Sequence, residues 1–311
     1  MNKRELINIA KLYYELNKSQ KYISNLLNIS IPTVSRKLKK ARKLGIVNFE
    51  IDYSYHNNYK IENKLIEKFE IKEVFVVDNL YNEYKLVYKD LTAQICAYLE
   101  EIILDDYTIG VSWGNTMSEI SKNFCNFNKN NIKLVELNGG IAQSKFSTSA
   151  HSILERFSSS FGGEPYYLSV PTIVDSKDIA NSLLKDSNIR HNLNIAEKSD
   201  VAIFGIGKLS QESVLYKAGY FNSKKYNDLI KKGVVGDICA RFFDINGNIV
   251  DKELNKRTLG VSLDNLKNKK YSIGVAVGQN KIEPILGALN KKYINVLFTD
   301  KVTAKSILDY P

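Results

Sequence analysis

Residues able to bind an anion gather at Thr108–Met117, which reads Thr-Ile-Gly-Val-Ser-Trp-Gly-Asn-Thr-Met. An apolar run, a loop and a helix start follow one another there, so the loop's backbone N–H groups would face outward beside a favourable helix dipole. Together with nearby hydroxyls they suit a phosphate group, and the candidate residues are Ser112, Gly114, Asn115 and Thr116. The glycines match neither a Walker A loop nor the dinucleotide-binding fingerprint. An ordinary tight turn is the alternative that this pattern leaves open.

Glycines also follow three other predicted strands, in the segments Asn138-Gly139-Gly140, Gly205-Ile206-Gly207 and Gly278-Gln279-Asn280-Lys281. Lys281 falls in the first turn of a predicted helix, where a cation opposes the helix dipole unless an anion lies between them. We therefore expect Lys281 to bind a phosphate or a sugar, the alternative being a lysine that extends into solvent. Asp237 stands within an apolar run. It either accepts hydrogen bonds from sugar hydroxyls or caps a strand end.

These residues need a scaffold that brings several strand ends together, and the second part of the chain predicts one. Short apolar runs alternate there with helical patterns, which indicates an α/β domain with a mostly parallel sheet covered on both faces. Ligands bind beyond the carboxyl ends of such strands. The predicted strands are 73–78, 108–112, 133–137, 201–206, 273–277 and 296–299. The predicted helices are 85–104, 115–124, 148–160, 176–186, 222–232, 281–291 and 301–309, and the whole domain spans 57–311.

The N-terminal segment, residues 1–56, predicts a different fold. Apolar spacing gives a first helix over 3–16, and Ser19 is a suitable N-cap for a second helix over 20–27. After a three-residue turn, a third helix runs to Gly45, which favours the left-handed conformation that ends helices. Two short helices with such a turn form a helix-turn-helix. The alternating residues 46–51 predict a short strand as a wing.

Charge supports a nucleic-acid role for this segment. Residues 1–52 hold eleven Lys and Arg against four acids, a net +7 of the chain's +10. A positive field on so small a unit indicates a polyanionic partner, which we expect to be double-stranded DNA. Thr33 and Arg36 are placed to contact base edges, and Lys39, Lys40 and Arg42 to contact phosphates. The full set of candidates is Gln20, Ser30, Thr33, Ser35, Arg36, Lys37, Lys39 and Lys40. A three-helix scaffold with a solvated basic face is the alternative.

Other chemistries have little support. Cys96, Cys125 and Cys239 are widely separated and odd in number, and the three histidines are equally scattered, so we expect no metal site and no cofactor. No apolar run is long enough to span a membrane, and the N-terminus lacks a signal-peptide pattern. These features predict a cytoplasmic protein without membrane contacts.

Motifs in both parts of the chain resemble the SorC-type family of sugar-responsive regulators, in particular its deoxyribonucleoside-responsive branch. The first motif is Gln20-x-x-Ile23-Ser24-x-x-Leu27-x-Ile29-Ser30-x-Pro32-Thr33-Val34-Ser35-Arg36, with Leu38, Ala41 and Gly45-Ile46-Val47 after it. The others are Gly110-Val111-Ser112-Trp113-Gly114-x-Thr116, Asn138-Gly139-Gly140, Gly236-Asp237-Ile238-Cys239-x-Arg241-Phe242-Phe243-Asp244-x-x-Gly247 and Asn295-Val296-Leu297-x-Thr299-Asp300-x-x-Thr303-Ala304. Together they cover nearly the whole chain.

The resemblance implies a sensor domain shaped like ribose-5-phosphate isomerase and glucosamine-6-phosphate deaminase, a phosphorylated sugar as inducer, and self-association. It also implies repression that ends when the inducer releases the protein from its operator. A homodimer would place two recognition helices one DNA turn apart, which predicts a palindromic operator, and a homotetramer would need two such sites.

One position departs from the family's pattern. The deoxyribonucleoside-responsive branch carries a lysine suited to imine formation just before the paired glycines, where this chain has Asn138. An amide cannot form a Schiff base. Deoxyribose 5-phosphate remains a candidate effector, without covalent attachment here, beside other phosphorylated sugars. The alternative function is a sugar-phosphate isomerase or deaminase fused to a DNA-binding domain, for which Asp237 would be the general base.

Overall fold

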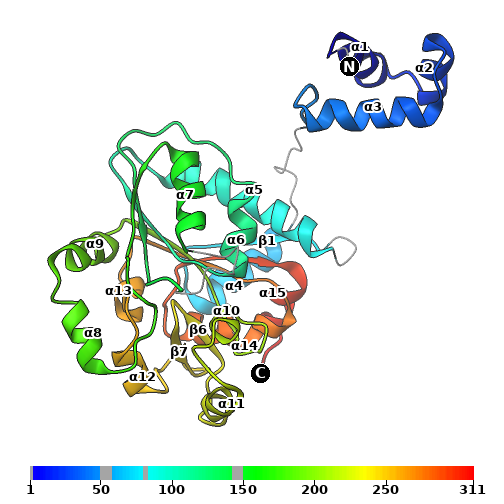
Figure 1. Cartoon of the computed structure of the whole chain (residues 1–311). Coiled ribbons are helices and arrows are strands. Elements are labelled where there is room, and N and C mark those ends of the chain that lie inside the picture. Colours follow the sequence, from blue (N-terminus) through cyan, green and yellow to red (C-terminus); the bar gives the residue numbers. More distant parts are fainter. Residues whose placement is uncertain (1–2, 50–57, 80–82, 142–149) are drawn as a thin grey trace. The chain divides into compact units, whose positions relative to one another are not determined.

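The computed structural model describes residues 3–49, 58–79, 83–141 and 150–311. The chain divides into two compact units, Met1–Tyr55 and His56–Pro311, here called the helical unit and the α/β unit (Figure 1). In the described part of the chain, no helix is both long and apolar enough to cross a membrane.

Three helices build the helical unit: α1 (Lys3–Ala10), α2 (Gln20–Leu27) and α3 (Ile31–Lys43). A π-helical turn over Lys11–Glu15 extends α1, which matches the predicted first helix. Apolar residues at helical spacing form the core of this unit, and they are Leu6, Ile9, Ala10, Ile23, Val34, Leu38 and Ala41. Burial of this stripe is what stabilises helices as short as these, since they are marginal alone.

Local hydrogen bonds define the two ends of the turn between α2 and α3. Ser19 and Ser30 cap the helices by accepting from the backbone N–H groups of Tyr22 and Thr33. Asn28 takes the left-handed conformation with φ 50°, and the Ser24 hydroxyl donates to the carbonyl oxygen of Ile29 at 2.5 Å. The predicted second and third helices and the three-residue turn are therefore confirmed.

The predicted wing is wrong for the residues that can be described. Ile46–Phe49 form no strand, and the remaining two residues of the prediction, 50–51, lie outside the described residues. Instead the Phe49 ring packs edge-on against Tyr14 and beneath the Arg42 guanidinium. Ile46 and Val47 pack against the core formed by Leu6, Ala10 and Ala41. The apolar residues that suggested a strand are thus used in contacts with the helices.

A seven-stranded sheet forms the centre of the α/β unit, in the order β1-β9-β8-β5-β2-β3-β4, with every neighbouring pair parallel. The strands are β1 (Glu73–Val77), β2 (Thr108–Val111), β3 (Lys133–Glu136), β4 (Glu164–Tyr166), β5 (Val201–Gly205), β8 (Tyr271–Val275) and β9 (Val296–Asp300). The predicted α/β class with a mostly parallel sheet is confirmed. Within this sheet, β4 has no predicted counterpart, because its three residues carry no apolar run.

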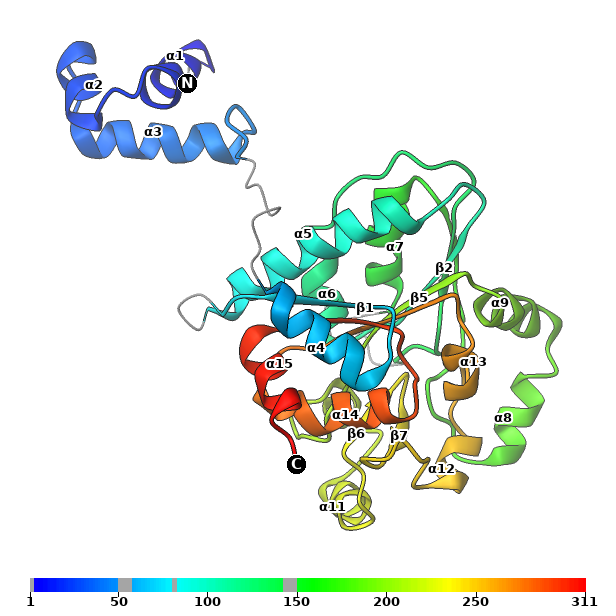
Figure 2. The same ribbon diagram turned by 180° about the vertical axis from the view of Figure 1, so that it is seen from behind.

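Helices cover both faces of this sheet, as Figures 1 and 2 show. On one face lie α5 (Tyr84–Ile102), α6 (Asn115–Ser121) and α7 (Ala150–Phe161), and on the other lie α4 (Tyr59–Phe69), α14 (Ile282–Asn290) and α15 (Lys301–Leu308). Successive strand residues alternate between the two cores: Ile203 packs toward α5–α7 and Phe204 toward the opposite layer. Further helices of this unit are α8 (Lys177–Leu183), α9 (Ser187–Glu197) and α13 (Leu263–Lys267).

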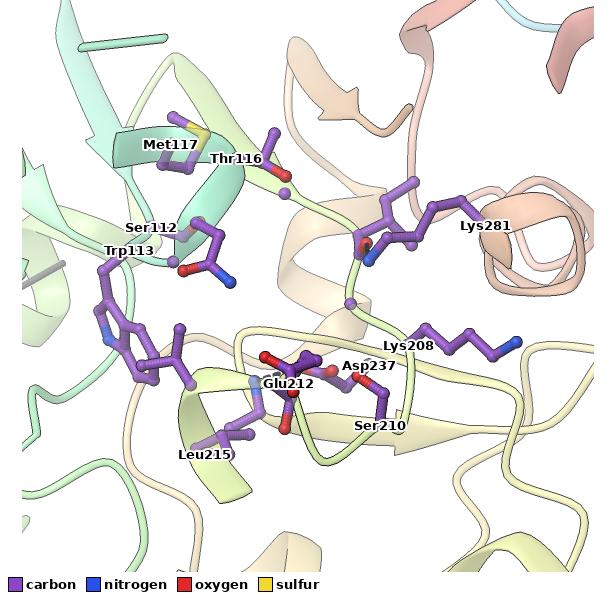
Figure 3. A pocket seen from close by; sticks show the side chains of 18 of the residues that line it. Ser112, Trp113, Thr116, Met117, Lys208, Ser210, Glu212, Leu215, Asp237 and Lys281 are labelled. Carbon is purple, nitrogen blue, oxygen red and sulfur yellow. Dashed lines mark hydrogen bonds between the residues drawn. The ribbon is translucent and has the colours of Figure 1, made fainter. Parts of the chain in front are cut away.

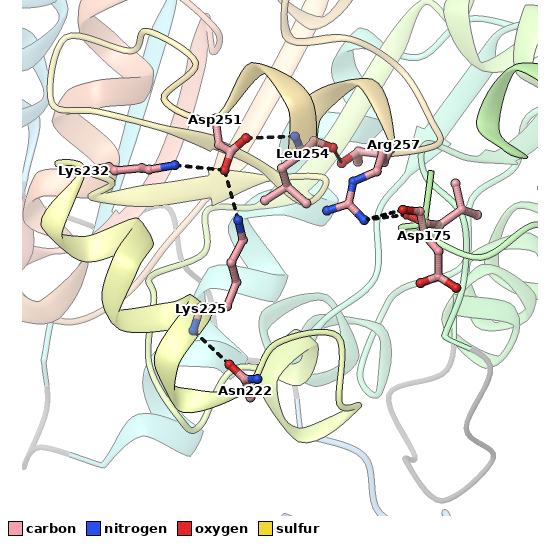
Figure 4. Close-up of polar contacts among 9 residues, drawn as sticks. Asp175, Asn222, Lys225, Lys232, Asp251, Leu254 and Arg257 are labelled. Carbon is pink, nitrogen blue, oxygen red and sulfur yellow. Dashed lines mark hydrogen bonds and ion pairs between the residues drawn. The ribbon is translucent and has the colours of Figure 1, made fainter. Parts of the chain in front are cut away.

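A second, two-stranded sheet of β6 (Gly236–Ile238) and β7 (Arg241–Phe243) lies with α10 (Val214–Lys217), α11 (Ser223–Lys231) and α12 (Lys252–Lys256). Figure 4 shows how ion pairs join this region: Asp251 caps α12 through the Leu254 N–H and pairs with Lys225 and Lys232. Strand β6 of this region carries Asp237, one of the predicted effector-binding residues.

Candidate effector site and nucleic-acid interface

A cavity of about 320 Å³ opens at the carboxyl ends of β2, β5 and β8 (Figure 3). This is the edge at which parallel sheets bind ligands. Polar groups from segments far apart in sequence surround it. Its lining includes Tyr84, Tyr88, Ser112, Trp113, Gly114, Asn115, Thr116, Met117, Asn138, Gly205, Ile206, Gly207, Lys208, Ser210, Glu212, Ser213, Leu215, Asp237, Asn280 and Lys281.

Lys281 supplies a positive charge to the cavity. It ends a single 3-10 turn, Gln279–Lys281, and directly precedes α14. Its ammonium donates to the carbonyl oxygen of Ile206 at 2.9 Å and has no ion pair with a carboxylate of the described residues. Burial lowers the pKa of Lys281, and the carboxylate of Asp237 opposes that change. The ammonium retains donors for a ligand, since it carries three hydrogens.

Asp237 approaches the same space from β6. Its Oδ2 accepts from the backbone N–H of Ala240 at 3.2 Å. Burial raises its pKa to about 6, against the opposing effects of Lys281 and the Ala240 N–H. The carboxylate lies so close to Gly207 that a Cβ there would be 2.0 Å from Oδ1. Gly207 therefore provides the room that this acid occupies.

The loop after β2 forms another wall of the cavity. The Ser112 N–H donates to the Ile203 carbonyl, and Gly114 takes φ 130°, which is strained for any other residue. The helix α6 then begins at Asn115, so the first N–H groups of that helix have no partner within it. Thr116 lies against Gly205 of β5. Strand, loop and helix start thus follow in the predicted order.

Asn138 also lines the cavity, but the two glycines after it do not. Gly139 donates to Leu259 and its carbonyl accepts from the Trp113 indole at 2.8 Å, while the Gly140 carbonyl accepts from Thr172. A Cβ on Gly139 would lie 2.6 Å from the carbonyl oxygens of Val170 and Pro171. Position 139 therefore requires glycine, because the neighbouring backbone leaves no room for a side chain.

Several lining residues were not predicted. Ser210, Glu212 and Ser213 come from the segment after β5, and Tyr84 and Tyr88 from α5. The two tyrosines are four residues apart and so share a helix face. That spacing was a usable signal, whereas the segment 208–213 is polar without any periodic pattern.

The candidate DNA-contacting residues lie on α3 and at its start. Ser30 is the N-cap, and its hydroxyl bonds that of Thr33 at 2.8 Å. Arg36, Lys39 and Lys40 are exposed, whereas Thr33, Ser35 and Gln20 are half-buried. Lys37 forms an ion pair with Glu5 of α1, and its side chain is only 16% exposed. The structure thus gives Lys37 a partner within the helical unit.

The chemistry available in the cavity is binding chemistry. Asp237 accepts its hydrogen bond from a backbone N–H group, and the other carboxylate of the described lining, Glu212, has an exposed side chain that pairs with Lys217. No histidine lies among the described lining residues. Among the residues that the structure describes, no cluster of His, Cys, Asp and Glu could hold a metal ion. A helix-turn-helix with exposed cations, joined to an α/β unit with a polar cavity, defines a ligand-responsive transcription regulator.

Comparison with known proteins agrees. Residues 53–309 match the Sugar-bind family of sugar-binding domains. The deoxyribonucleoside regulator of Bacillus subtilis is 36% identical over 303 residues, covering 97% of this chain and 96% of that protein. The crystal structure of the full-length sorbitol operon regulator SorC of Klebsiella pneumoniae superposes with a TM-score of 0.79 at 30% identity, covering 99% of both chains. A DeoR family transcriptional regulator from Listeria monocytogenes gives 0.74 at 28% identity, over 80% of this chain and 99% of that one.

The chain belongs to this sugar-binding domain family, and it is a sugar-responsive transcription regulator of the SorC type. The enzymatic alternative is not supported, because these relatives are transcription regulators.

Proposed function

We propose that the effector is a phosphorylated sugar that binds in the cavity of the α/β unit. One observation carries the proposal: the Lys281 ammonium is withdrawn from water without an ion pair to any carboxylate of the described residues, in the same cavity as an acid of raised pKa. A withdrawn cation favours an anionic ligand. The phosphate would contact Lys281 and the N–H groups of Gly114, Asn115 and Thr116, and the hydroxyls would contact Ser112, Asp237 and Asn138. Gly139 and Gly140 would act by shaping the backbone beside Asn138.

Residues 1–56 would form the DNA-binding domain, with α3 in the major groove. Thr33 and Arg36 lie in the first two turns of this helix and would reach base edges. Lys39 and Lys40 would contact phosphates, with Gln20, Ser30, Ser35 and Lys37 beside them at the same surface. Residues 57–311 would sense the effector and carry the self-association.

The regulator would act as a homodimer or homotetramer on a palindromic operator. Two-fold symmetry of the protein matches two-fold symmetry of the DNA site, because each recognition helix then contacts an equivalent half-site. Effector binding releases the operator only if the effector prefers one arrangement of the protein over another.

The test is fluorescence anisotropy of labelled DNA from upstream of the protein's own gene cluster. The DNA is titrated with protein, and the complex is then challenged with phosphorylated sugars, deoxyribose 5-phosphate among them. We expect one compound to lower DNA affinity at micromolar concentration. DNA binding that no phosphorylated sugar changes would contradict the effector assignment, and absence of DNA binding would contradict the role of α3.

A further inference from the structure

We propose that Cys96 and Cys125 form a modification site: hydrogen peroxide oxidises this pair of thiols to an intramolecular disulfide, and thiol reductants restore the pair. Neither residue lines the effector cavity. The chemistry of the pair therefore does not depend on which effector the α/β unit binds.

The fold brings together two thiols that lie 29 positions apart in the sequence. Cys96 is on α5, and Cys125 is in the segment between α6 and β3. The backbone N–H group of Cys125 donates to Sγ of Cys96 at 3.2 Å, and the two thiols also share a hydrogen bond. A disulfide forms without large backbone movement only where the two side chains already approach one another. This pair meets that condition while both thiols are free.

The third cysteine of the chain is placed differently. Cys96 and Cys125 pack in the core on the α5–α7 face of the sheet, where Cys125 is half-buried and so open to a small oxidant. Cys239 belongs to the core of the opposite face, so the sheet separates it from the pair. Burial raises the pKa of Cys239 to about 12, and the thiolate that reacts with oxidants is therefore scarce there. Cys239 serves as an unreactive internal reference.

The hydrogen bonds to the Cys96 sulfur make it the nucleophile of the pair. Donation from the Cys125 thiol stabilises the Cys96 thiolate and lowers the pKa of Cys96, although burial opposes this change. The thiolate attacks one oxygen of the peroxide, so that the O–O bond breaks, a sulfenic acid forms and hydroxide leaves. The hydroxide takes up a proton and becomes water.

Cys125 completes the reaction. Its contact with the Cys96 thiolate raises the pKa of Cys125, but that negative charge disappears once the sulfenic acid has formed. The Cys125 sulfur then attacks the Cys96 sulfur, the S–S bond forms, and the sulfenic oxygen leaves as a second water molecule. In total, two thiols lose two electrons and two protons, and one peroxide becomes two molecules of water.

The bridge would join two elements that supply walls of the effector cavity, because α5 carries Tyr84 and Tyr88 and α6 carries Thr116. These two helices pack against each other. A disulfide stabilises a fold mainly by restricting the unfolded chain, and the loop closed here contains all of β2 and α6. In a reducing compartment such a bridge is transient, which is typical of redox-sensing thiols.

The experiment treats the reduced full-length chain with a small excess of hydrogen peroxide, unfolds it and alkylates the remaining thiols. We expect one alkylated cysteine of the three, a disulfide-linked peptide pair containing Cys96 and Cys125, and recovery of all three thiols after dithiothreitol. The oxidised chain should unfold about 5–10 °C higher than the reduced chain. The fluorescence of Trp113, the only tryptophan, reports this transition for the α/β unit.

Three variants serve as controls. C96S and C125S should each lose the bridge and the oxidation-dependent rise in unfolding temperature. C239S should still form the bridge, and after oxidation it should have no thiol left to alkylate. Peptide mapping of the wild type decides the outcome even if C96S fails to fold.

The proposal is wrong if peroxide leaves all three thiols free, if it takes Cys96 to a sulfinic acid without a bridge, or if the disulfide joins two chains or includes Cys239. An unchanged unfolding temperature of the bridged chain would contradict the stabilising effect of the bridge.

Discussion

Charge is exposed in the helical unit and withdrawn from water in the α/β unit. On α3, Arg36, Lys39 and Lys40 project into solvent. In the α/β unit, Asp237 and Lys281 have shifted pKa values because burial disfavours their charged forms. Exposed cations attract a polyanion over a distance and respond to salt, whereas desolvated charges act at contact and respond to geometry and pH. Substitutions or conditions that weaken DNA binding should therefore leave effector binding unchanged, and the reverse should also hold.

The largest expected effect tests the withdrawn charge. K281M removes the ammonium with little change of shape, and we expect about a 100-fold rise in the Kd of the effector, since a charge-assisted contact in a desolvated site is lost. DNA affinity without effector should stay unchanged, so the variant would stay bound to the operator in the presence of effector. Paired anisotropy and calorimetry measure both. If K281M also lost DNA binding, the prediction that the two units bind their ligands independently would be wrong.

The next effect tests the exposed charge. R36A should weaken operator binding about 30-fold and reduce discrimination against altered half-sites, because a base-edge contact contributes about 1–3 kcal/mol. Effector Kd should not change. The control is K43A in the last turn of the same helix, which should weaken binding only a few-fold at all sequences. Equal effects of R36A and K43A would contradict the proposal that Arg36 of α3 recognises base edges.

A smaller effect follows from the raised pKa of Asp237, about 6. Above that pH the carboxylate is ionised and accepts from sugar hydroxyls; below it the group is protonated, so effector affinity should fall about three- to tenfold between pH 7.5 and pH 5.5. The phosphate of a sugar phosphate also titrates near pH 6. The D237N variant separates the titration of Asp237 from that of the phosphate. Its effector affinity should be lower at pH 7.5 and should depend on pH only through the phosphate of the ligand. A wild-type profile identical to that of D237N would contradict the role of Asp237.

The smallest effect concerns stability alone. Burial raises the pKa of Glu136 from 4.5 to about 8, and its Oε1 lies 3.2 Å from Nδ1 of His151 on α7. Between these pH values the folded chain holds a proton that the unfolded chain releases, so the free energy of unfolding should fall as pH rises through that window. E136Q should flatten this decline and raise Tm above pH 8 by about 2–4 °C. Substitution of the exposed Glu67 by Gln is the control, and an unchanged slope in E136Q would refute the assignment.

Much of the fold was predictable because its signals are local. The parallel strands are apolar runs, and Ser30, Pro32 and Gly45 mark the ends of α3 by their own conformational preferences. At the cavity, the glycines and Lys281 stood out as breaks in those patterns, and the structure brings Ser112, Asn138, Asp237 and Lys281 to one cavity. Their roles in binding remain predictions.

The rest depends on contacts between distant residues. Glu5 lies far from Lys37 in sequence, so no local pattern shows that the two pair. The path of 208–213 past the cavity depends on how β5 connects to α10 and α11, and a polar stretch carries no information about that path. Ile46–Phe49 alternates like a strand, but Phe49 finds its partners in Tyr14 and Arg42.

The pairing of β1 with β9 has a consequence for biosynthesis. Among the described strands, β1 has β9, the last strand, as its only neighbour in the sheet, and α4 packs against α15 beside them. On the ribosome, the helical unit can complete its core early, whereas β1 must wait for nearly all of the remaining chain to emerge. A nascent or truncated chain would therefore present a folded DNA-binding head on an unfinished sensor. Such a chain would lack the self-association that residues 57–311 are proposed to carry, so completion of the sensor would also be a condition for stable operator binding.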